Sequence, residues 1–102
     1  MANENYQIQT NPMQTLVGLK TLVVANTNAI TDKRILAISV TSDATVDVAT
    51  GYDENGNEIN FYSSDEYKWQ SLKAGDLLLC GENRYISNFQ LDTAGRVLIY
   101  YI

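Results

Sequence analysis

From residue 16 onward, short apolar runs alternate with polar turn residues, and no convincing helix is longer than two turns. Val, Ile, Thr and Tyr dominate the runs, and these are the residues that β-strands favour. Clusters of Gly, Asn and Asp separate the runs about every eight to twelve residues. The pattern predicts an all-β fold: a single small β-sandwich, jelly-roll or immunoglobulin-like, of about eight short strands.

The strands have different expected environments. Residues 34–41 are apolar on both faces, which predicts a central strand. Residues 44–52 alternate, which predicts that Ala44, Val46 and Val48 face the core while intervening side chains face water. The expected strands are 16–25, 30–33, 34–41, 44–52, 58–62, 77–80, 84–91 and 96–102.

Three connections carry sequence signals. Asn55-Gly56 predicts a type I′ hairpin turn between residues 44–52 and 58–62. Residues 63–72 fit either a helix with a capping box or an alternating edge strand, and the neighbouring strands favour the strand. Residues 84–102 predict a closing hairpin whose second strand lies inside the sheet.

The first fifteen residues differ from the rest. They are rich in Asn, Gln and Thr and contain Pro12, which interrupts any regular element. The chain therefore divides into an N-terminal arm, residues 1–15, and a β-sandwich domain, residues 16–102. The arm is either a frayed end or a segment that orders on a partner. On the second interpretation, the candidate protein-interface residues are Tyr6, Ile8, Met13, Leu16 and Val17.

The composition argues against catalysis. The chain has no histidine and one cysteine, so the commonest general base and imidazole metal ligands are missing. No usual zinc site can be built within one chain, and no glycine-rich phosphate loop occurs. Cys80 follows three leucines and is expected to be a small buried side chain. We expect no enzymatic activity, no cofactor and no metal centre.

Acidic residues gather between residues 53 and 66, where no basic residue occurs. A solvated acidic loop is one interpretation. A calcium site is another, because hard oxygen ligands suit Ca²⁺. A pair of glycosidase acids is a third, although such a pair needs a cleft. The calcium ligands would be Asp53, Asn55, Asn57 and Glu58.

Five aromatic residues in the second half also permit three interpretations. They can fill cross-strand positions in the sheet, form a protein interface or stack against sugars. The residues are Tyr52, Tyr62, Tyr67, Trp69 and Tyr85.

The charge distribution bears on the partners. The net charge is −5 and no basic stripe is present, so neither nucleic acid nor an anionic membrane surface is an expected partner. No apolar run approaches the length of a membrane span, and no secretory signal is evident at the start. We expect a soluble protein that is made in the cytoplasm.

Three stretches resemble one protein family. They are the run from Arg84 to Ile102 (RYISNFQLDTAGRVLIYYI), the run from Leu36 to Val46 (LAISVTSDATV) and the turn from Lys73 to Asp76 (KAGD). Together they resemble small β-sandwich structural proteins of tailed bacteriophages, with the crAss-like phages as a candidate source. Such proteins decorate heads, build head fibres or trim tails.

The resemblance implies a non-enzymatic virion structural protein, a capsid decoration or auxiliary head protein assembled in the host cytoplasm. Its partners would be the major capsid protein, other virion proteins and neighbouring copies in a homo-oligomer. The alternative is a carbohydrate- or calcium-binding β-sandwich module used in host attachment.

Overall fold

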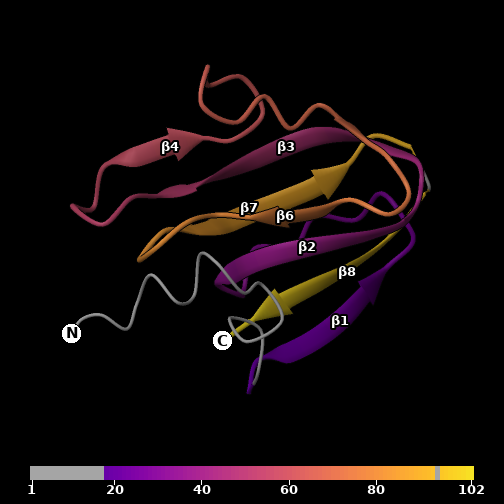
Figure 1. The fold of residues 1–102 in the computed structure, drawn as a ribbon, viewed down its shortest axis with the longest axis horizontal. Helices are drawn as coiled ribbons and strands as arrows, with labels where there is room; N and C mark the ends of the chain where they lie inside the picture. Colours follow the sequence, from indigo (N-terminus) through magenta and orange to yellow (C-terminus); the bar gives the residue numbers. More distant parts are fainter. Residues whose placement is uncertain (1–17, 94) are drawn as a thin grey trace.

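The computed structural model describes residues 18–93 and 95–102 and is all-β in that part of the chain, as predicted (Figure 1). Every pairing between its strands is antiparallel. The strands are β1 (Lys20–Val24), β2 (Ile35–Ser42), β3 (Ala44–Tyr52), β4 (Glu58–Asn60), β5 (Ser71–Leu72), β6 (Leu77–Leu79), β7 (Tyr85–Leu91) and β8 (Arg96–Tyr101).

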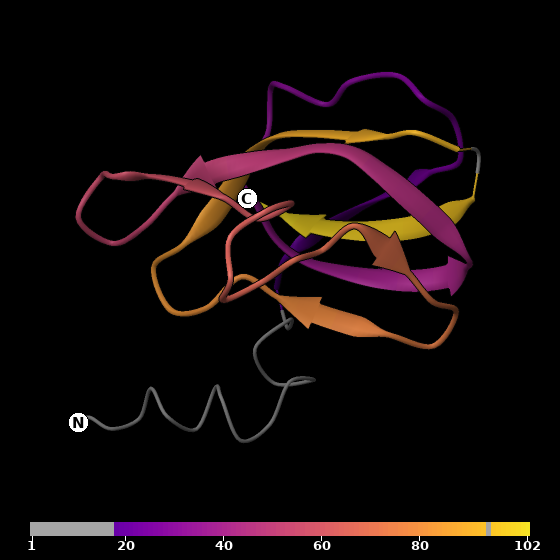
Figure 2. The ribbon, with the colours of Figure 1, turned by 90° about the horizontal axis from the view of Figure 1, so that it is seen from above.

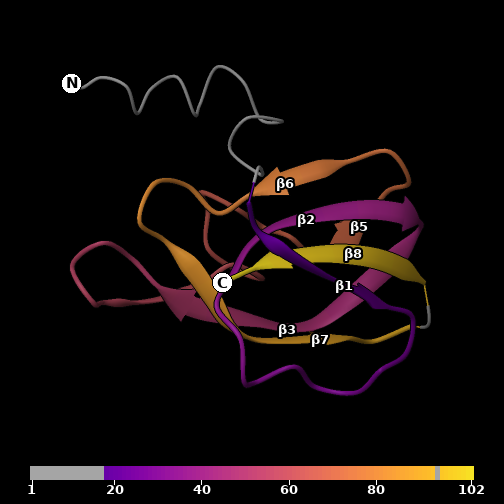
Figure 3. The same ribbon diagram turned by 90° about the horizontal axis from the view of Figure 1, so that it is seen from below.

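The strands form two layers that are joined into one folded sheet (Figure 2). The first layer has the order β1-β8-β2-β6, which is visible in Figure 3. In the second layer, Ile30 bridges to β7, β7 pairs with β3, and β4 and β5 share the outer edge of β3. Pairing of Ile35 with Ile86 joins the layers. This order is that of a jelly roll, the first of the two predicted topologies.

The predicted closing hairpin is wrong. Strand β7 pairs with β3, whereas β8 pairs with β1 and β2, so the chain changes layer between them. Strands β2 and β3 also lie in different layers. The two crossings brace each other: the Asp92 amide donates to the Thr45 carbonyl (2.8 Å), and the Thr45 and Thr93 hydroxyls lie 3.0 Å apart. Gly95 fits there because a Cβ atom would overlap Ala44.

The predicted edge strand over residues 63–72 is also wrong, since only β5 is extended there and the preceding residues form turns. Lys68 has φ 52°, which interrupts an extended strand. The Tyr67 and Trp69 rings lie 4.4 and 5.3 Å from the ring of Phe61, measured between centroids. Phe61 is fully buried, so packing of these rings on the core favours the turns over a regular strand.

Two local details of β3 differ from the prediction. A bulge between Val46 and Val48 shifts the alternation, so Ala49 is fully buried and Val48 only partly buried. The turn after β3 is a hairpin, but it is not type I′, because Gly56 has positive φ and Asn55 does not. The Gly56 amide donates to the Asp53 carbonyl (3.1 Å), as in a type I turn followed by a glycine bulge.

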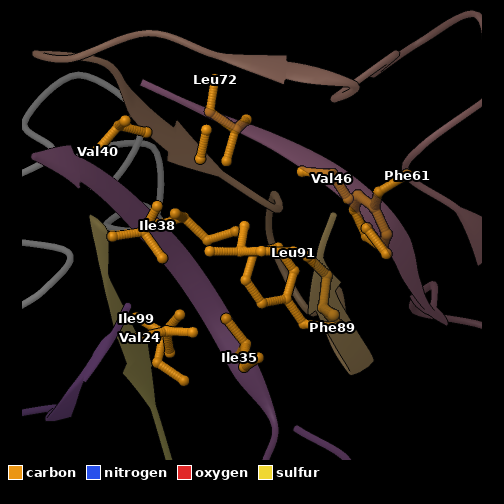
Figure 4. Close-up of a cluster of buried hydrophobic side chains, with 14 of the residues drawn as sticks. Val24, Ile35, Ile38, Val40, Val46, Phe61, Leu72, Phe89, Leu91 and Ile99 are labelled. Atoms are coloured by element: carbon orange, nitrogen blue, oxygen red, sulfur yellow. The ribbon is translucent and has the colours of Figure 1, made fainter. Parts of the chain in front are cut away.

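The core lies between the two layers and contains no buried polar or charged side chain among the described residues (Figure 4). Strand β2 pairs with β8 along one edge and with β6 and β7 along the other, which confirms the central position expected for this segment. Burying this apolar surface is the main favourable contribution to folding. The largest fully buried side chains are Phe61, Phe89, Ile35, Ile38, Leu72, Ile86, Leu91, Ile99, Val97 and Cys80.

Two isoleucines near the end of the chain allow a matched test of this core. Ile99 is fully buried, whereas Ile102 is 61% exposed. Substituting Ile99→Ala should lower the free energy of unfolding by about 2–5 kcal/mol, since it leaves a cavity between the layers. Ile102→Ala should change it by less than about 0.5 kcal/mol. Urea unfolding followed by tryptophan fluorescence measures both, and equal losses would contradict the described packing.

Candidate functional site

The five predicted interface residues, Tyr6, Ile8, Met13, Leu16 and Val17, lie outside the described residues, so their assignment stays a prediction. Within the described part, four strands have pairing on one edge alone. Strand β1 pairs with β8, β6 with β2, and both β4 and β5 with β3. Val23 on β1 is 51% exposed. Such an open edge can accept a strand from another chain.

A cluster around Arg84 joins three connections that are distant in sequence. Arg84 Nε donates to Glu54 Oε1 at 2.9 Å, and Nη1 donates to Glu66 Oε1 at 3.1 Å. Nη1 also donates to the Tyr67 hydroxyl at 3.0 Å, which in turn donates to the Cys80 carbonyl at 2.6 Å. The cluster therefore ties together the β3–β4 turn, the turns after Phe61 and the β6–β7 connection.

The cluster changes the acidity of its members. The hydrogen bond from Arg84 lowers the pKa of Glu54, and the hydrogen bond to Glu54 raises the pKa of Arg84. Burial raises the pKa of Tyr67, so its hydroxyl keeps its proton and donates to the carbonyl. Two carboxylates thus neutralise one guanidinium, and this cluster stabilises the fold without leaving a cation for a ligand.

The carboxylates of the acidic stretch have separate partners: Glu54 and Glu66 bind Arg84, whereas Asp53 binds backbone amides. Asp53 Oδ1 accepts hydrogen bonds from the amides of Asn55 (2.8 Å) and Asn57 (2.9 Å), and the bond from Asn57 lowers the pKa of Asp53. This carboxylate caps the β3–β4 turn. Among the described residues, no group of three or more His, Cys, Asp or Glu side chains could hold a metal ion.

The five aromatic residues do not form one continuous surface. Tyr52 and Tyr85 face each other across β3 and β7, with ring centroids 5.7 Å apart. Tyr67 and Trp69 pack on Phe61, and Tyr62 packs against the core. This arrangement fits cross-strand and core packing, one of the three interpretations, and leaves the pair of Tyr52 and Tyr85 beside an open surface.

Cys80 is buried, as predicted, with 1% of its surface exposed. Its thiol donates to the Ile35 carbonyl at 3.4 Å. Burial raises the pKa of the Cys80 thiol to about 12. The thiolate needed for nucleophilic or redox chemistry is therefore scarce at neutral pH.

The candidate site is an open hollow of about 570 Å³, which we call the Arg34 hollow. It lies where the segment before β2 meets the start of β7 and the end of β8. The sequence prediction missed it, although Lys33-Arg34 is the sole adjacent pair of basic residues in the chain. Its lining residues are Thr31, Asp32, Lys33, Arg34, Tyr85, Ser87 and Ile102.

Aromatic rings support both cations of the hollow. The guanidinium carbon of Arg34 lies 5.1 Å from the centroid of the Tyr85 ring, and Lys33 Nζ lies 4.7 Å from that of Tyr101. Lys33 also lies 3.6 Å from Asp32. The Ile102 amide donates to the Arg34 carbonyl (3.1 Å), which fixes the apolar wall beside the cations.

Comparison with known proteins adds no family. No family model, no curated protein and no solved structure matches the chain. In the part of the chain that the structure describes, no helix is long and apolar enough to span a membrane.

Removing the cation of the Arg84 cluster tests its stabilising role. Arg84→Met should lower the free energy of unfolding by about 1 kcal/mol, because it leaves Glu54 and Glu66 without their cation. Arg96→Met is the control, since Arg96 is exposed and has no carboxylate partner among residues 18–93 and 95–102. Equal effects of the two substitutions would contradict the role of the cluster.

The cluster also predicts a pH dependence. The pKa of Glu54 is lowered from its ordinary value of 4.5, so its contribution is present above pH 4.5 and is lost as pH falls through the folded-state pKa. Thermal melts between pH 2.5 and 6 should therefore converge for wild type and Arg84→Met at the acidic end. A difference in stability that stays constant across this range would refute the assignment.

Proposed function

We propose that the chain is a non-enzymatic structural protein of a bacteriophage virion, a capsid decoration or auxiliary head protein. It binds the major capsid protein or neighbouring copies. The observation that supports this proposal best is the combination of an apolar jelly-roll core with polar groups and open strand edges confined to the surface. Jelly rolls are common in viral capsid proteins, although a fold alone does not fix a function.

The surface chemistry is consistent with a binding role. The Arg84 cluster stabilises connections, the Asp53 carboxylate caps a turn, and the Cys80 thiol is buried. Strand β1 begins at Lys20, a few residues after the proposed arm of residues 1–15, and we infer that the arm and the open edge of β1 contact one partner together. Many copies on one particle would strengthen a modest affinity at each contact.

A carbohydrate-binding module for host attachment is the second candidate. Tyr52 is 38% exposed and pairs with Tyr85 beside the Arg34 hollow, and jelly rolls also occur in lectins. Tyr52→Ala on a glycan array separates the candidates. Glycan binding that this substitution abolishes would favour the second function over the first.

Deleting residues 1–15 tests the proposed function and the role of the arm together. We expect the full chain to bind purified capsids. The shortened chain should stay folded but bind at least about tenfold more weakly, because three of the predicted interface residues, Tyr6, Ile8 and Met13, are removed. Co-sedimentation with capsids measures binding, and circular dichroism measures folding. A variant with Tyr6→Ser, Ile8→Ser and Met13→Ser keeps the length and is the matched control.

Two outcomes would count against this account. Failure of the full chain to bind capsids would contradict the virion role. Unchanged binding after deletion would contradict the arm and leave the strand edges as the contact.

A further inference from the structure

Arg34 and Arg84 differ in the charges that surround them. Arg84 is neutralised by Glu54 and Glu66. Arg34 has no ion pair with any residue in 18–93 or 95–102, and its guanidinium lies over the neutral ring of Tyr85. A neutral ring positions a guanidinium without cancelling its charge, so hydrogen-bond donors of Arg34 remain for another molecule.

The neighbours of Arg34 also favour binding of an anionic group. Lys33 supplies a second positive charge, which Asp32 offsets in part at 3.6 Å. Thr31 and Ser87 also line the hollow, where the Ser87 hydroxyl donates to the Thr50 carbonyl at 3.5 Å. A planar guanidinium with a nearby ammonium suits a carboxylate, which accepts two parallel hydrogen bonds.

We propose that the Arg34 hollow binds a carboxylate side chain of an acidic protein segment. The inference deepens the proposed function and rests on it only for the identity of the partner, a virion protein. Ile102, which is 61% exposed on the same wall, favours a segment with an apolar residue beside its acid. Covering an exposed aliphatic side chain adds hydrophobic stabilisation to the ion pair.

The net charge of the chain favours a partner with few carboxylates over a polyanion. At −5 the protein repels a polyanion such as nucleic acid at long range. A segment with one or two carboxylates experiences little of this repulsion at physiological salt, where the Debye length is about 8 Å. The hollow is also open, so its occupant can remain part of a larger surface.

Peptide titration of the full chain followed by NMR tests the proposal. The probe is acetyl-Leu-Asp-Glu-Leu-amide, and acetyl-Leu-Asn-Gln-Leu-amide is its neutral isostere. The acidic peptide should shift the Arg34 Nε–H and Tyr85 ring resonances in a saturable manner, more weakly as salt rises. Arg34→Gln should weaken binding at least about tenfold.

Matched variants separate the hollow from the net charge. Arg96→Gln and Lys73→Gln remove the same charge from exposed positions elsewhere and should change the affinity less than about twofold. Lys33→Gln should weaken binding by less than Arg34→Gln, because Asp32 already offsets Lys33. Arg34→Lys keeps the charge but loses the planar fork, so it should fall between wild type and Arg34→Gln.

Several results would overturn the proposal: equal shifts with the neutral peptide, an Arg96→Gln effect as large as that of Arg34→Gln, or no saturable shift in the wild type at low salt. Tighter binding of glucuronate than of the acidic peptide would assign the hollow to sugar acids instead. Capsid co-sedimentation of the wild type tests the virion role separately, so either proposal can fail alone.

Discussion

The backbone of Ile35 is the point on which the two-layer arrangement depends. Ile35 pairs with Ile86 of the second layer and with Tyr101 of the first, and its side chain is fully buried. Its carbonyl also accepts the thiol of Cys80, which comes from the end of β6. Strand β2 therefore has neighbours on both edges, and its first residue joins the two layers.

At the C-terminal end of β2, several connections pass from one layer to the other. Strand β3 begins one residue after β2 in the other layer, and β8 returns beside it after leaving β7. The Asp43 carboxylate accepts the Ala74 amide at 2.8 Å, so the β5–β6 connection joins the same end. Three sheet changes thus support one another, and each depends on contacts between residues distant in sequence.

The sequence predicted the parts of the fold that depend on local pattern. The all-β class follows from short runs rich in β-branched residues, the central position of β2 from its two apolar faces, and the burial of Cys80 from the three leucines before it. Pairing partners could not be predicted in this way, because the residues between Leu91 and Arg96 suit a hairpin or a crossing equally well. The contacts of Thr93 and Gly95 with the β2–β3 corner decide between them.

The same reason explains what was missed at the surface. Lys33-Arg34 was visible as a pair of cations, but Tyr85, Tyr101 and Ile102 join it only after both layers have formed. The turns over residues 63–70 replaced an expected strand because Tyr67 and Trp69 pack on Phe61, a contact that alternation alone does not reveal. Local sequence patterns therefore predict most of the strands, whereas the Arg34 hollow depends on contacts between residues that are distant in sequence.

Quantitative mass spectrometry of purified virions, from the phage that would encode this chain, tests the central claim most directly. A decoration or auxiliary head protein should be present in many copies per particle, in a fixed ratio to the major capsid protein, after washing that removes loosely adsorbed protein. Absence of the chain from washed particles of a host culture that produces it would contradict the account.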